Sequence, residues 1–188
     1  MRFTENRPIA WAVLVACALG SIVGLGGAGM ARERSKALDV FYRGSGKAAA
    51  ASSTTHSMDA YLDRAADCAQ IMASEVQLLL GESSDAQLML DQLADLSGDG
   101  SIDARYAAYQ QVKSLSDKLY NAVYASDTSD AQRVNFKAAY DDFWGCDKYI
   151  LKDPYRQLAA DFNSNMQGFP ADAVCSLVGV DELTGFGS

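Results

Sequence analysis

The sequence predicts an all-α protein in which a single N-terminal transmembrane helix precedes an antiparallel bundle of three to five helices. The first observation is a run of twenty-four residues without a charge, 8–31. About 20 apolar residues are enough for a helix to cross the hydrocarbon core of a bilayer. The second is that apolar residues after this run recur every three or four positions, which is the period of a helix. The third is that Pro8, Pro154 and Pro170 all stand at the edges of expected helices.

The N-terminal segment admits two interpretations. As an anchor, residues 8–31 stay attached behind a short flank of residues 1–7 and contact the lipid bilayer directly. As a cleaved signal peptide, Arg2 and Arg7 supply the basic start, and Gly29 and Ala31 supply a small-residue cleavage site. The run is long for a signal, and an amphipathic helix continues through residues 32–42. We therefore favour the anchor, with the exported form as the alternative.

Charges beside the anchor predict its orientation. Two Lys/Arg residues precede the segment, and five follow it: Arg32, Arg34, Lys36, Arg43 and Lys47. Because positive flanks stay inside the cell, this bias predicts a single-pass protein of the cell membrane with its soluble domain in the cytoplasm.

The anchor also carries small residues at every fourth position, namely Ala12, Ala16, Gly20, Gly24 and Ala28. We name these five residues the small-residue ridge. Such a ridge lets two membrane helices pack closely, which would give a homo-oligomer through the transmembrane helix. Gly and Ala are also common in membrane helices and signals that make no such contact.

Charge and cysteine content exclude several function classes. Residues 1–47 carry seven Lys/Arg and three Asp/Glu, a balance of +4, whereas residues 48–188 carry nine and twenty-one, a balance of −12. An acidic domain repels phosphate backbones, so no nucleic-acid partner is expected. Cys68, Cys146 and Cys175 are widely spaced and odd in number, which fits neither a disulfide framework nor a zinc site. We expect Cys68 to be a buried free thiol.

The soluble part divides into a basic juxtamembrane helix and linker (residues 32–55), a helical-bundle domain (56–180) and a frayed tail (181–188). Ser57 is an expected N-cap for a helix that ends at Gly81, and Ser84 is expected to cap a shorter helix that runs to residue 96. Ser101 should cap a third helix, residues 102–123.

The remaining helices follow from the same signals. Thr128 or Ser129 should start a helix that extends to residue 150. Asp153 followed by Pro154 is typical of a cap and first helical position, which opens a helix that ends at Gly168. Residues 174–180, after Pro170, form a short apolar piece that we expect to fold back onto the bundle, because four apolar side chains would otherwise be exposed.

Residues 95–103 resemble the start of an EF-hand calcium loop. Asp95, Ser97 and Asp99 would be side-chain ligands, and Asp103 would bind through a water molecule. The twelfth position is Tyr106, where a bidentate Glu belongs. Asp, Gly and Ser are also the ordinary residues of a turn between helices. We expect a structural turn with at most weak calcium affinity.

No other segment carries a catalytic pattern. The single histidine, His56, lies at the linker edge, and nucleophile, zinc-protease and phosphate-loop motifs are absent from the sequence. The many aromatic residues at helical spacing fit a core better than a ligand cleft. The sequence therefore predicts a non-enzymatic protein without a cofactor.

The last third of the chain resembles the LemA family. The similarity lies in Asp153-Pro154-Tyr155, Phe162-Asn163, Gly168-Phe169-Pro170-Ala171 and Leu177-Val178-Gly179-Val180. The family's stretch after the anchor, with Trp, Asp, Arg and Leu-Ile-Pro-Asn, is absent, so the chain is similar to a short, divergent member. The resemblance implies a bacterial, membrane-anchored helical bundle with a cytoplasmic domain, and it implies neither an activity nor a site.

Together these observations predict a scaffold or interaction module that binds an unknown protein partner. The alternative is an exported helical sensor or ligand-binding domain that uses the aromatic-lined interior.

Overall fold

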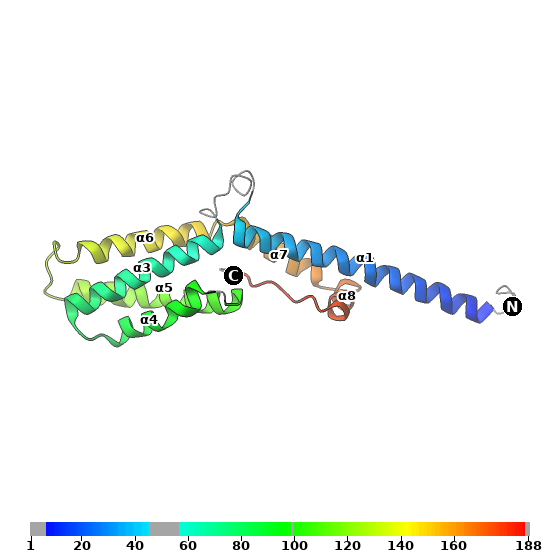
Figure 1. Ribbon diagram of the computed structural model, residues 1–188, viewed down its shortest axis with the longest axis horizontal. Coiled ribbons are helices and arrows are strands. Elements are labelled where there is room, and N and C mark those ends of the chain that lie inside the picture. The colour runs from blue at the N-terminus through cyan, green and yellow to red at the C-terminus, as the bar shows by residue number, and fades with distance from the viewer. Residues whose placement is uncertain (1–6, 46–56, 99, 187–188) are drawn as a thin grey trace. The chain divides into compact units, whose positions relative to one another are not determined.

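The computed structural model describes residues 7–45, 57–98 and 100–186, and within these ranges every regular element is a helix (Figure 1). The all-α prediction is therefore confirmed. The helices are α1 (Arg7–Arg43), α3 (Met58–Leu80), α4 (Ser84–Ser97), α5 (Ile102–Ala125), α6 (Val134–Ile150), α7 (Pro154–Met166) and α8 (Ala171–Val178).

The described residues form two compact units. The first consists of residues 7–38 and 157–183, and the second of residues 39–156 and 184–186. Helices α1 and α7 contribute residues to both units.

The second unit contains the helical bundle that the sequence predicts. Helix α3 packs against α4, α5 and α6, and α4 also packs along α5 (Figure 1). The apolar stripe of α3 is buried as its spacing predicts, with Leu62, Met72 and Val76 fully enclosed. Phe136 and Phe143 of α6 and Val112 of α5 complete this core.

The helix caps explain where most of these helices begin. Ser57 and Ser101 accept hydrogen bonds from the backbone N–H groups of Ala60 (3.2 Å) and Ala104 (3.2 Å), as predicted. The cap of α4 is Ser83 rather than Ser84. Helix α6 begins later than expected, at Val134. Residues 130–133 form a turn in which the Gln132 side chain accepts the Ser129 N–H at 2.9 Å.

In the first unit, α1 is a 37-residue helix that includes the whole uncharged run. It is the one helix among the described residues that is long and apolar enough to cross a membrane, and only 6% of its most apolar window is buried. A core helix of a soluble protein would be mostly covered. The remaining interpretations of this segment are a membrane span and a signal sequence.

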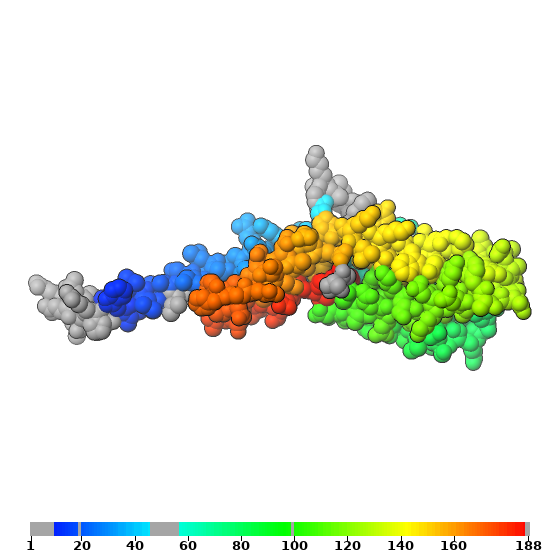
Figure 2. All heavy atoms as spheres, turned by 180° about the vertical axis from the view of Figure 1, so that it is seen from behind, coloured from blue at the N-terminus to red at the C-terminus, as the bar shows by residue number. Residues whose placement is uncertain are grey.

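Helix α8 packs against α1 within the first unit. A Cβ atom added to Gly26 would lie 3.6 Å from Val174 Cγ1, and one added to Gly27 would lie 2.8 Å from Val178 Cγ1. Figure 2 shows the end of α7 and α8, in orange to red, alongside α1 in blue. The apolar piece after Pro170 therefore folds back, as expected, but its contact is with the uncharged run of α1.

Residues 183–186, within the segment expected to be a frayed tail, make specific contacts. In the first unit, the Asn163 side chain donates to the Leu183 carbonyl (2.7 Å) and accepts from its N–H (2.8 Å). In the second unit, Phe186 is buried between Tyr155, Tyr106 and Phe41. One apolar side chain near the end of the chain thus completes an aromatic cluster.

Candidate functional site

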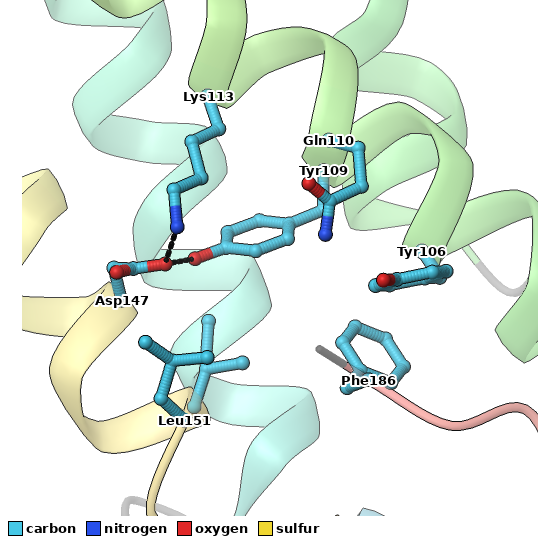
Figure 3. A pocket seen from close by; sticks show the side chains of 8 residues that line it. Tyr106, Tyr109, Gln110, Lys113, Asp147, Leu151 and Phe186 are labelled. Atoms are coloured by element: carbon cyan, nitrogen blue, oxygen red, sulfur yellow. Dashed lines mark hydrogen bonds and ion pairs between the residues drawn. The ribbon is translucent and has the colours of Figure 1, made fainter. Parts of the chain in front are cut away.

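The bundle contains a small pocket between α5 and α6 that the tail also lines. Its volume is about 250 Å³. Tyr106, Tyr109, Gln110 and Lys113 come from α5, and Asp147 comes from α6 (Figure 3). Tyr109 and Lys113 are one helical turn apart, so their side chains share the face of α5 that turns toward α6. Phe186 lies edge-on against Tyr106, with 4.7 Å between the ring centroids.

A polar cluster of Tyr109, Lys113 and Asp147 forms one wall of this pocket. The Asp147 carboxylate is 5% exposed, and its Oδ1 lies 2.8 Å from Lys113 Nζ. The Tyr109 hydroxyl donates a hydrogen bond to the same oxygen. Lys113 Nζ also lies 5.0 Å from the centroid of the Trp144 ring, a cation–π distance. The buried carboxylate is thus satisfied by two donors, as a buried charge requires.

Burial and the hydrogen bond to Asp147 both raise the pKa of the Tyr109 hydroxyl above its usual value. Burial is the larger cause, because the phenolate would lose its hydration. Tyr109 therefore remains a protonated donor at neutral pH. The charges of Lys113 and Asp147 compensate each other. The pocket therefore presents this ion pair, the amide of Gln110 and the rings of Tyr106 and Phe186. This arrangement suits the binding of a small polar molecule.

The residues of the calcium-like loop are distributed over two helices. Asp95 and Ser97 belong to α4, and the Ser97 hydroxyl donates to the Leu93 carbonyl at 2.8 Å. Asp103 is in the first turn of α5 and accepts a hydrogen bond from Thr184. Asp99 lies outside the described residues. In the part of the chain that the structure describes, no three His, Cys, Asp or Glu side chains form a group that could hold a metal ion.

Arg105 connects the two ends of this loop to α3. Its Nε donates to the Leu96 carbonyl at 2.8 Å, and its guanidinium pairs with Asp59 and, at 2.8 Å, with Asp63. The guanidinium is 4% exposed. A buried cation thus stands beside the turn and ties α3, α4 and α5 together.

The small-residue ridge lies on an open surface of α1. Ala12, Ala16 and Ala28 are exposed, and a Cβ placed on Gly20 or Gly24 would meet no atom within 4 Å. At 100° per residue, Gly26 lies about 160° from Gly24 around the helix axis, whereas Gly27 lies about 60° from it. The two glycines that contact α8 are not members of the ridge, but Gly27 lies beside it.

Cys68 is a buried free thiol, as predicted, and its neighbour is a second one. Cys68 in α3 and Cys146 in α6 are both buried, and a hydrogen bond links their thiols. This hydrogen bond, with burial, raises the pKa of Cys68, and the same bond lowers the pKa of Cys146. The widely spaced sequence positions gave no indication of this pair.

Sequence reasoning missed Lys113 and Asp147. A signal for Asp147 was present, since it shares the spacing of Phe143 and Ile150, which form the apolar stripe of α6. A charged residue in such a stripe must find a partner when the helix is buried. Comparisons with protein families, with curated protein sequences and with solved structures find no match to this chain.

Proposed function

We propose that the protein is a single-pass membrane protein whose helical bundle acts as a non-enzymatic scaffold or interaction module. The observation that carries the proposal is the exposure of α1. Leu14 is 59% exposed and Leu25 is 79% exposed, and most of the uncharged run is likewise uncovered. Each large apolar side chain gains about 1.5–3 kcal/mol when it leaves water, so a surface of this size favours a lipid environment.

Fractionation and intact-mass measurement test this proposal. The full chain should remain with membranes after washing at high salt and high pH, and its mass should include residues 8–31. A mature N-terminus near Arg32 would instead identify a cleaved signal and an exported domain.

The basic residues after the segment support a cytoplasmic bundle, and introduced cysteines test the orientation. Leu78 of α3 is 79% exposed, so Leu78→Cys provides an accessible thiol on the bundle. An impermeant thiol reagent should label Leu78→Cys only after lysis, whereas Thr4→Cys on the N-terminal flank should react in intact cells. The reverse pattern would place the bundle outside.

The open small-residue ridge supports a homo-oligomer as part of the same proposal, because two helices can approach closely along it. The unknown protein partner would bind the acidic bundle. The LemA resemblance agrees with this architecture, but the proposal does not depend on it.

The pocket beside Asp147 favours a second candidate function, an exported helical sensor or ligand-binding domain. Its lining combines an ion pair with aromatic rings, and such a mixture of polar and apolar groups can orient a small ligand. A panel of small polar metabolites should then raise the melting temperature of the full chain, and Lys113→Met should abolish that rise. A panel without effect, together with a cytoplasmic bundle, would favour the scaffold.

A further inference from the structure

We propose that α8 is an interfacial helix, and that it and the Phe169-Pro170 turn before it lie in the boundary layer between lipid headgroups and acyl chains. This inference rests on the proposed membrane anchoring of α1. It goes further by assigning a lipid partner to the apolar segment that follows Pro170.

The contact between α8 and α1 fixes the level of α8 along the anchor. Val174 and Val178 face Gly26 and Gly27, and both glycines belong to the uncharged run. The first charge after the run is Arg32, five residues beyond Gly27. At 1.5 Å per residue, α8 contacts α1 about 7.5 Å below this charge. Interfacial helices bury their apolar face about 5–10 Å into the boundary layer.

The α8 segment carries large apolar side chains that nothing covers, although Asp172 and Ser176 are exposed as well. Phe169 is 93% exposed and Leu177 is 72% exposed, although Val174 and Cys175 on the same segment are buried. Leu25, beside the two glycines that α8 contacts, is equally open. The exposed apolar side chains of α8 therefore extend the apolar surface of the anchor. The lipid that surrounds the anchor would contact them as well.

Polar groups bracket α8 where an interfacial position requires them. Asp172 is in its first turn, and Gly179 ends the helix in a left-handed conformation (φ 67°). Asp181 and Glu182 follow after Val180 and are exposed. Because these charges are acidic, they offer no attraction to anionic headgroups. The α8 segment itself therefore needs no anionic headgroup, and we assign it a zwitterionic phospholipid surface, whereas the basic residues from Arg32 onward belong to α1.

Tryptophan quenching in vesicles tests this position. The full chain with Trp11→Phe and Trp144→Phe carries no native tryptophan. Phe169→Trp or Leu177→Trp then reports on the α8 region, and Leu78→Trp on α3 is the matched exposed control. Each variant is reconstituted into phosphatidylcholine vesicles whose acyl chains are brominated either near the glycerol end or near the chain terminus.

We expect the shallow bromines to quench Phe169→Trp and Leu177→Trp strongly, the deep bromines to quench them less, and neither to affect Leu78→Trp. Phe169 has almost no packing to lose, so its replacement keeps the test valid if Leu177→Trp disturbs folding.

Flotation of the same vesicles measures membrane anchoring separately. If the variants float but are not quenched, the interfacial position is wrong and the anchoring stands. A blue-shifted emission without quenching would show that protein covers α8, and a chain that fails to float would overturn the anchoring as well.

Discussion

Asp147 is a carboxylate at a position of α6 where the neighbouring turns carry Phe143 and Ile150. Its burial is tolerated because Lys113 and Tyr109 both contact one of its oxygens. Lys113 remains partly exposed, so its own charge stays hydrated, whereas the carboxylate depends on its two partners. The cost of disturbing the cluster should therefore depend on which member is removed.

We expect Asp147→Ala to lower the free energy of unfolding by about 2–4 kcal/mol, because the buried Tyr109 hydroxyl loses its acceptor and the Lys113 ammonium loses its counter-charge. Urea unfolding followed by circular dichroism measures this loss. Asp141→Ala is the matched control, since Asp141 pairs with Lys137 on an exposed face and should leave the midpoint unchanged. Equal effects of the two substitutions would show that the cluster does not stabilise the bundle.

Tyr109 gives a prediction for alkaline pH. The ordinary pKa of its hydroxyl is 10.0, and burial with the Asp147 contact raises the pKa in the folded state. Above pH 10 the unfolded chain releases this proton while the folded chain retains it, so stability should fall as pH rises. Tyr109→Phe should flatten this fall without abolishing it, because the pKa values of Tyr61 and Tyr140 are also raised. Urea midpoints on both sides of pH 10 measure the slope, and an unchanged slope would contradict the assignment.

At the scale of single elements, the contact between α8 and α1 depends on a glycine. A Cβ at Gly27 would lie 2.8 Å from Val178 Cγ1, which is too close for two carbon atoms. Gly27→Leu should therefore release α8, and hydrogen exchange of residues 171–178 should accelerate. Gly29→Leu is the control, because nothing lies within 4 Å of that position. Equal exchange in the two variants would show that α8 does not need this contact.

The turn between α4 and α5 should not be a calcium site of physiological strength. It lacks a carboxylate at Tyr106, and the buried Arg105 guanidinium already supplies a positive charge to the neighbouring carboxylates of α3. Calorimetric titration of the full chain should show no binding tighter than about millimolar. Micromolar binding that Asp99→Ala abolishes would contradict this.

The helices could be predicted from the sequence because caps and apolar spacing act over a few residues. Ser57, Ser101 and Asp153 each cap the helix that they were expected to cap. Partners distant in sequence could not be predicted in this way. Asp147 and Lys113 are 34 residues apart, and only the packing of α5 and α6 on α3 brings them together. For the same reason, the contacts of Phe186 with Tyr155, Tyr106 and Phe41 could not be predicted from the sequence.

At the scale of the whole molecule, apolar and acidic residues occupy different parts of the chain. The uncharged run and the basic residues after it occur in the first quarter, and the acidic residues are concentrated in the remainder. Helix α8 is the exception, since an apolar segment from the far end of the sequence contacts the uncharged run of α1. The lipid-facing surface that we propose is therefore assembled from both ends of the chain.

The small-residue ridge is one open surface of α1, and its small side chains suit contact with a second copy. Close approach of two helices requires small side chains along the contact, and a Cβ added to Gly20 or Gly24 would meet no atom within 4 Å.

We expect the full chain to self-associate in lipid vesicles, measured by energy transfer between labelled copies. Gly20→Ile combined with Gly24→Ile should abolish the transfer, because two branched side chains hold the backbones apart. Gly29→Ile, off the ridge, should preserve it. A wild-type chain without transfer, or a loss that Gly29→Ile produces equally, would contradict oligomerisation through the ridge, and the ridge would then face lipid alone.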